Sequence, residues 1–124
     1  MGRLFLRYLD SSKCIYKCNT CDAHLAVPED VVSKDFQGTL GKAYLFAKCV
    51  NVACAPKEER YLVTGMHTVC DVFCVSCRSI VGWRYIKAKE PEQKYKEGKT
   101  ILEKMRICRQ EQNPTQHLVS PTRI

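Results

Sequence analysis

Short apolar-rich runs recur along the chain, and turn residues separate them. The runs are rich in β-branched and aromatic side chains, which is typical of β-strands. They cover residues 4–9, 14–17, 43–52, 60–64, 68–73 and 80–87. Gly38 and Gly41 bracket one expected turn, and Gly65 marks a turn or a bulge. Residues 56–59 are expected at a solvated hairpin tip, so the pattern as a whole predicts a mainly β domain.

Two segments carry short helical signals. Residues 28–30 combine a proline with acidic side chains, which suits a helix start, but the two valines that follow are poor helix formers. We therefore expect only a turn or two there. Residues 92–109, and residues 99–109 above all, fit both a helix and a strand, because Ile101 and Met105 satisfy both periodicities. Since Gly98 interrupts a long helix, we expect one or two helical turns before it and a strand after it.

The composition is that of an ordinary globular protein. Hydrophobic residues make up 45% and charged residues 27% of the 124 positions, which argues against global disorder. The longest apolar stretch, residues 43–47, is far shorter than the roughly 20 residues of a membrane helix. We expect no secretory leader, and one compact domain over residues 1–109 with a polar, flexible tail over residues 110–124.

Nine cysteines are many for this chain, and their spacing predicts a metal site. Their odd number and the expected lack of secretion disfavour a complete disulfide framework. Cys18 and Cys21 form one Cys-x-x-Cys pair, and Cys74 and Cys77 form a second. A single pair would also fit a thioredoxin-like redox motif. Two pairs complete the tetrahedral shell of four thiolates that Zn²⁺ prefers, so they predict one structural zinc ion.

The distance between the two pairs predicts what the metal does. Residues 22–73 separate them, whereas a zinc ribbon has roughly 15–20 residues between its pairs. Closing such a loop costs roughly 3–4 kcal/mol. Zinc binding in small peptides supplies about 10–16 kcal/mol, which outweighs that cost. We therefore expect the ion to join distant halves of the domain.

The other cysteines are expected to be small buried hydrophobic residues. Cys14 precedes the first pair and Cys70 the second by the same spacing. Four residues along a strand span about 13 Å, so neither thiol reaches the ion. Free cysteines are usually buried, and we expect this of Cys14, Cys49, Cys54, Cys70 and Cys108. The repeated spacing itself predicts two pseudo-symmetric hairpins that meet at the metal.

A longer set of residues stands at a characteristic spacing. It comprises Cys18, Cys21, Gly41, Leu45, Asn51, Gly65, Cys74, Cys77, Gly82, Trp83, Tyr85, Lys96 and Glu103. This pattern resembles the signature of the yippee family, and the resemblance covers residues 1–109. So many fixed positions make it highly specific. Residues 1–6 also resemble the start of the branch that is associated with the GID/CTLH ubiquitin ligase.

The resemblance implies a fold and a function class. The implied fold is a zinc-anchored β-tent, in which two antiparallel sheets or hairpins join at one four-cysteine zinc site with one or two short helices. Mis18, the thalidomide-binding domain of cereblon and methionine-R-sulfoxide reductases share it. The implied function is a non-enzymatic adaptor or regulator in the nucleus and cytoplasm, with ubiquitin-ligase subunits as partners and cell-cycle or growth-related roles.

Trp83 and Tyr85 are candidate pocket residues, because they fall on one face of the strand over residues 80–87. Similarity to the cereblon domain implies that this strand contributes to an aromatic cage for a ligand or peptide. The rest of that cage does not match, since Trp83 is the only tryptophan. Aromatic side chains also fill β-rich cores, so core packing and partner binding both stay open.

The positive charge is concentrated late in the chain. Residues 78–109 hold ten basic and four acidic side chains, which accounts for most of the net charge of +7. Basic surfaces bind phosphates, so a nuclear module that contacts nucleic acid or chromatin is the main alternative function. Lysine and glutamate alternate over residues 87–99, however, and this favours a solvated or protein-docking face.

A redox enzyme is the second alternative. Methionine-R-sulfoxide reductases share the implied scaffold but need a reactive cysteine outside the zinc shell. Cys108 is the candidate, with Arg106 and Arg109 near enough in sequence to lower its pKa. No histidine accompanies it closely, and it matches no element of the signature.

The first residues form a candidate docking segment. Gly2, Arg3 and Leu4 would be exposed once the initiator methionine is removed, and chain ends can be captured by dedicated receptors. The simpler alternative is that Leu4 and Leu6 fill the core from an edge strand. Leu6 also stands where N-myristoylation favours serine or threonine, so no membrane partner is expected.

Overall fold

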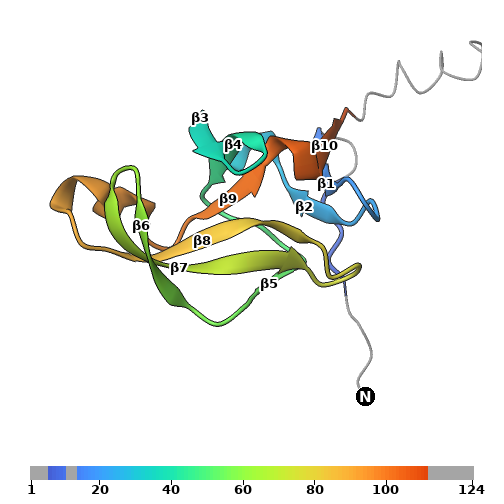
Figure 1. The fold of residues 1–124 in the computed structure, drawn as a ribbon. Helices are drawn as coiled ribbons and strands as arrows, with labels where there is room; N and C mark the ends of the chain where they lie inside the picture. The colour runs from blue at the N-terminus through green and yellow to red at the C-terminus, as the bar shows by residue number, and fades with distance from the viewer. Residues whose placement is uncertain (1–5, 11–13, 112–124) are drawn as a thin grey trace, which may run out of the picture.

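The structure is a computed structural model that describes residues 6–10 and 14–111, and these form two antiparallel sheets (Figure 1). The smaller sheet has the strand order β10-β1-β2, with β1 Ile15–Cys18, β2 His24–Ala26 and β10 Ile107–Gln110. The larger sheet has the order β3-β4-β9-β8-β7-β5, and β6 also pairs with β7. Its strands are β3 Val31–Gly38, β4 Gly41–Phe46, β5 Val52–Cys54, β6 Glu58–Leu62, β7 Gly65–Cys74, β8 Ile80–Ala88 and β9 Thr100–Glu103.

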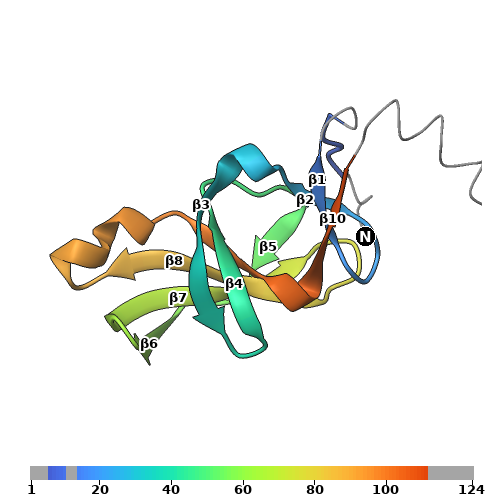
Figure 2. The ribbon, with the colours of Figure 1, turned by 90° about the horizontal axis from the view of Figure 1, so that it is seen from above.

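Three single 3-10 helices connect the strands within the described ranges: η1 Pro28–Asp30, η2 Pro91–Lys96 and η3 Lys104–Arg106. Among the described residues, no helix has the length and apolar character needed to cross a membrane. In both ribbon views the smaller sheet lies at one end of the long β7–β8 hairpin, while η2 lies at the other end (Figures 1 and 2). The prediction of a mainly β, two-sheet fold is therefore confirmed.

The side chains between the two sheets form the main hydrophobic core. Tyr16 and Leu25 from the smaller sheet pack with Phe46, Val72 and Leu102 from the larger sheet. The rings of Tyr16 and Phe46 meet edge to face, with their centroids 5.4 Å apart. Such aromatic pairs stabilise a core by about 0.5–1.5 kcal/mol beyond the area they bury. The core thus joins segments from both ends of the chain.

A second core cluster, formed by buried residues of the larger sheet, lies beside a buried cation; its members are Ala43, Leu45, Val69, Tyr85 and Ile101. Lys96 is 2% exposed, and its Nζ donates a hydrogen bond to Thr64 Oγ1 at 3.1 Å. The ammonium group also lies over the rings of Phe36 and Tyr85, 5.0 and 5.2 Å from their centroids. Burial lowers the pKa of Lys96, and the electron-rich ring faces offset part of the cost of burying its charge. These contacts fix η2 against the larger sheet.

Several sequence predictions are confirmed. The turn between Gly38 and Gly41 joins β3 to β4, and residues 28–30 form the single-turn η1. The strand expected at residues 80–87 is β8. The ambiguous segment resolves as η2 before Gly98 and then β9, η3 and β10 after it. Since β10 reaches Gln110, the last strand ends one residue beyond the expected domain boundary; residues 112–124 of the expected tail lie outside the described residues.

Other predictions were wrong because long-range pairing overrides local pattern. The run over residues 43–52 is a strand only to Phe46, since the chain bends there and Asn51 adopts a positive φ of 60°. Residues 58–59 are not a hairpin tip but the start of β6, because β7 is long enough to pair with both β5 and β6. Strand β3 was not expected. A strand was expected over residues 4–9, but residues 6–9 lie outside the strands.

Gly82 provides a test of the close approach between β8 and β9. A Cβ at this position would lie 1.7 Å from the carbonyl oxygen of Ile101, in the middle of the larger sheet. We expect Gly82→Ala to destabilise the zinc-loaded protein by about 3 kcal/mol or more in chemical denaturation. Gly98→Ala is the control, because Gly98 has open space around it and only a φ of +81°, which should cost about 1–2 kcal/mol. Equal losses would contradict this account of the sheet.

Candidate metal centre

The four predicted zinc ligands come together at the junction of the two sheets. The Sγ atoms of Cys18, Cys21, Cys74 and Cys77 all lie within 4.8 Å of one another. The sulfurs of Cys18 and Cys77 are 3.6 Å apart, and those of Cys21 and Cys74 are 3.5 Å apart. A tetrahedral zinc ion with Zn–S bonds of about 2.3 Å requires sulfur–sulfur edges of about 3.8 Å. The arrangement therefore fits a single four-coordinate zinc ion.

Two loops of the same shape present these thiolates. In the first loop, between β1 and β2, the N–H of Asp22 donates to the carbonyl of Cys18 at 2.8 Å. In the second loop, between β7 and β8, the N–H of Arg78 donates to the carbonyl of Cys74, also at 2.8 Å. Asp22 and Arg78 both have positive φ angles, 66° and 67°. The expected pair of pseudo-symmetric hairpins is confirmed, although neither residue is a glycine that would have signalled the left-handed position.

Backbone contacts from distant segments hold each loop. The N–H of Asn19 donates to the carbonyl of Arg106 at 2.9 Å, and the N–H of Val75 donates to the carbonyl of Asn51 at 3.0 Å. Each donor is the residue directly after the first cysteine of its pair. The loops are therefore fixed by the fold as well as by the metal.

Asn51 also clamps the start of the described chain. Its Nδ2 donates to the carbonyls of Arg7 and His24, both at 2.7 Å, and its Oδ1 accepts from the N–H of Arg7 at 2.7 Å. In addition, Nδ1 of His24 accepts a hydrogen bond from the N–H of Leu9 at 2.9 Å. Gly2, Arg3 and Leu4 lie outside the described residues.

The four clustered thiol groups need a cation to compensate their negative charge when they are ionised. Burial raises the pKa of Cys18, and it raises that of Cys74 to about 12. Burial acts in the same direction on Cys77, but contacts with Ser79, whose hydroxyl lies 3.2 Å from Sγ, and with the neighbouring thiols lower its pKa to about 6. Four thiolates this close repel one another unless a divalent ion compensates their charge. With four protein ligands the zinc shell is closed, which is the arrangement of structural sites.

The five remaining cysteines do not join this cluster. Cys70 is buried, and Cys14, Cys49 and Cys108 are half-buried, in line with the expectation of a packing role. Cys54 was wrongly predicted to be buried. It is the last residue of the three-residue strand β5, at the edge of the larger sheet, and its side chain is exposed for that reason.

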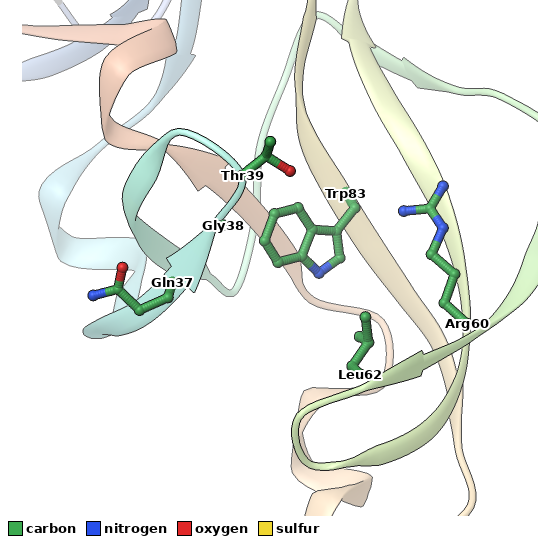
Figure 3. Close-up of a pocket in the computed structure, with 6 residues that line it drawn as sticks. All are labelled: Gln37, Gly38, Thr39, Arg60, Leu62 and Trp83. Carbon is green, nitrogen blue, oxygen red and sulfur yellow. The ribbon is translucent and has the colours of Figure 1, made fainter.

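Trp83 and Tyr85 have different environments although they share a strand. Tyr85 is 2% exposed and belongs to the second core cluster, and burial raises its pKa. Trp83 is half-buried and lines a cavity of about 420 Å³ together with residues from the β3–β4 turn and from β6 (Figure 3). The other lining residues are Gln37, Gly38, Thr39, Arg60 and Leu62.

Comparisons with known proteins place this centre in a family context. Residues 14–118 match the family model described as Yippee zinc-binding/DNA-binding/Mis18, centromere assembly. A yippee-like protein of Solanum tuberosum is 55% identical over 107 residues, which cover 86% of this chain and 81% of that protein. Yippee-like protein 3 of Homo sapiens is 52% identical over 101 residues, which cover 82% and 85%. The crystal structure of the Mis18 "Yippee-like" domain matches the fold with a TM-score of 0.64 at 10% identity, covering 80% of this chain and 96% of that chain.

Cysteine variants test directly which residues bind the zinc ion. We expect one zinc ion per chain by elemental analysis, and Cys18→Ser or Cys74→Ser should lose it and largely unfold, because metal binding is part of the folding energy in such sites. Cys14→Ser and Cys70→Ser should keep the zinc and lose only about 1–2 kcal/mol of packing energy. Retention of zinc by Cys74→Ser together with its loss from Cys70→Ser would show that the ligand set is wrong.

Proposed function

The chain belongs to the yippee family, and we propose that it acts as a non-enzymatic, zinc-stabilised adaptor or regulator that binds other proteins. The partner class that we propose is a multisubunit ubiquitin ligase of the GID/CTLH type, with cell-cycle or growth-related roles in the nucleus and cytoplasm. The resemblance of residues 1–6 to one branch of the family supports the partner class. The cavity beside Trp83 supports the binding role.

This cavity has the features of a preformed site for a peptide segment. Its apolar walls are Trp83 and Leu62, while Gln37, Thr39 and Arg60 supply polar groups. Sites of this kind combine an apolar lining with a few fixed polar groups. The neighbouring side chains of β6 and its turn are strongly exposed, with Tyr61 at 83% and Val63 fully accessible. Because Tyr61 alternates with the lining residues Arg60 and Leu62 along β6, it faces away from the cavity, and a partner segment would find apolar area inside the cavity on Trp83 and Leu62.

Glu103 makes one wall of the cavity rigid. Its Oε1 accepts a hydrogen bond from the N–H of Leu40 at 2.9 Å, which ties the β3–β4 turn to β9. A Cβ on Gly38 would lie 2.5 Å from the same oxygen and 3.1 Å from the Trp83 ring. The turn therefore packs closely against Glu103 and Trp83, and a larger residue at position 38 would have to displace the Glu103 carboxylate. A preformed wall reduces the ordering cost of binding.

The coordination shell of the zinc ion and the surroundings of Cys108 favour a protein-binding role over an enzymatic one. A closed shell of four cysteines leaves no coordination position for a substrate or an activated water. Arg109, which was expected to activate Cys108, donates from Nε to the Sγ of Cys14 at 2.9 Å. Cys108 lies on β10 opposite Lys17 and is half-buried. These contacts weaken the reductase alternative.

A basic cavity supports nucleic-acid binding as the second candidate function. It has a volume of about 190 Å³ and is lined by Lys34, Lys104 and Arg109 together with the rings of Tyr16 and Tyr44. The Nζ of Lys34 lies 5.5 Å from the centroid of the Tyr44 ring. Cations interleaved with aromatic rings suit the phosphates and bases of single-stranded nucleic acid. The description of the matching family model also includes DNA binding.

Thr39→Arg separates the two candidates, because Thr39 is exposed and the new side chain would fill the mouth of the larger cavity. In quantitative affinity purification from native cells, we expect it to lower the recovery of ligase subunits at least about tenfold, which corresponds to a loss of about 1.4 kcal/mol. The melting temperature and zinc content should not change. Thr20→Arg, the same change at an exposed position in the first cysteine loop, is the matched control.

The opposite result would favour the second candidate. If Lys34→Glu combined with Lys104→Glu abolished partner recovery, and if binding to arbitrary DNA fell steeply with salt, the basic cavity would be the functional site. Loss of recovery in both Thr39→Arg and Thr20→Arg would reject the cavity as the docking site.

Deletion of residues 1–3 tests the docking segment separately. The hydrogen bonds between Asn51 and Arg7 hold the described chain beyond this deletion, so we expect an unchanged melting temperature. Recovery of ligase subunits should be abolished. Unchanged recovery would reject the docking hypothesis, and parallel losses of stability and recovery would indicate that these residues belong to the core.

A further inference from the structure

Arg84 connects three strands on one face of the larger sheet. It lies on β8 directly opposite Cys70 of β7, so the two side chains share a face. Its Nε donates a hydrogen bond to Thr100 Oγ1 at 2.9 Å on β9. Its Nη1 donates to the Sγ of Cys54 at 3.4 Å, at the end of β5 on the far side of β7. The guanidinium group is thus held beside an exposed thiol.

The thiol of Cys70 lies next to that of Cys54. Cys54 is paired with Val72 on the neighbouring strand, so Cys70, two residues away, is its diagonal neighbour on the same face. Cys70 is 2% exposed, whereas Cys54 is exposed to solvent. Burial and the adjacent Cys54 thiol raise the pKa of Cys70 to about 11, an effect that the charge of Arg84 opposes. An accessible thiol, a buried thiol and a cation therefore form one group.

We propose that Cys54 and Cys70 form a peroxide-sensitive dithiol, in which Cys54 is oxidised first and Cys70 then closes a disulfide bond. The thiolate of Cys54 attacks one oxygen of hydrogen peroxide, which breaks the O–O bond and gives a sulfenic acid and, after protonation, one water. The sulfur of Cys70 then attacks the sulfenic sulfur. The S–O bond breaks, the Cys70 proton leaves with the hydroxide as a second water, and the two cysteines have supplied both electrons of the reduction.

The surroundings assign the two steps to different thiols. Peroxide can reach the exposed thiol of Cys54, and the cationic Nη1 of Arg84 contacts its Sγ at 3.4 Å. Conversion of Cys54 to a neutral sulfenic acid removes the neighbouring negative charge that disfavours a Cys70 thiolate. The cation of Arg84 remains in place. The first oxidation therefore activates the second thiol.

The dithiol is separate from the metal centre. Cys70 precedes the zinc ligand Cys74 by four residues, which is about 13 Å along a strand. A bond between Cys54 and Cys70 would join β5 to β7, two strands that are already paired. Oxidation of this pair should therefore leave the zinc shell intact.

The experiment is a hydrogen peroxide titration of the zinc-loaded full-length chain. Remaining thiols are alkylated, the peptides are mapped by mass spectrometry, and released zinc is measured with a chromogenic chelator. We expect a Cys54–Cys70 disulfide at peroxide levels that release no zinc. Cys70→Ser should instead accumulate a dimedone-reactive sulfenic acid at Cys54. Cys54→Ser should protect Cys70 from oxidation.

Arg84 variants test the role of the cation. Arg84→Met should slow the oxidation of Cys54 about tenfold, because it removes the cation that contacts the Sγ of Cys54, and Arg84→Lys should restore most of the rate. Arg109→Met is the matched control, because Arg109 donates to Cys14 on the smaller sheet at 2.9 Å. That change should leave the oxidation of Cys54 unaffected.

Three results would overturn the proposal. One is a disulfide that joins Cys54 to Cys49, or that joins zinc ligands, in place of the Cys54–Cys70 bond. The second is zinc release in step with the loss of the Cys54 thiol. The third is oxidation of Cys70 at the wild-type rate in Cys54→Ser, which would remove Cys54 from the first step even if the Arg84 variants failed to fold.

Discussion

The four-cysteine zinc centre is the constraint on which the two-sheet architecture depends. The strands of the smaller sheet are only three or four residues long, too short for a stable sheet without further support. The ion joins the loop after β1 to the loop after β7, across more than fifty residues of chain. Its binding energy of about 10–16 kcal/mol exceeds the cost of closing that loop. The core between the sheets, with Tyr16 against Phe46, can then form.

The metal centre could be predicted from the sequence because the spacing of the cysteines within each pair already indicates metal binding. A Cys-x-x-Cys pair offers two thiolates to one ion wherever the second pair lies in the sequence. The pairs that begin at Cys18 and Cys74 could therefore be assigned to one site without knowledge of the fold. Strand β3 could not be found in this way, since its pairing with β4 depends on the tertiary fold and shifts register twice. The exposure of Cys54 has the same origin, because it follows from the place of β5 at a sheet edge.

Trp83 and Tyr85 show the same limit for the candidate binding site. Strand periodicity correctly places their side chains on the same face of β8, but it cannot predict which other segments pack against that face. Tyr85 packs under the ammonium group of Lys96 in the core, whereas Trp83 meets the β3–β4 turn and the open cavity. The difference arises from where the β3–β4 turn lies and from the buried carboxylate of Glu103, which ties it to β9. A cavity-lining residue and a core residue can thus stand two positions apart on one face of a strand.

Asn51 makes the metal centre and the beginning of the described chain parts of one thermodynamic system. Its carbonyl accepts from Val75 in one cysteine loop, while its side chain binds Arg7 and the carbonyl of His24, just beyond the other loop. Ordering the metal loops and ordering the segment at Arg7 therefore favour each other. By reciprocity, a ligand that selects the clamped segment raises the affinity for zinc by the same factor by which zinc raises the affinity for that ligand. Loss of the metal would therefore loosen the segment at Arg7 together with the two cysteine loops.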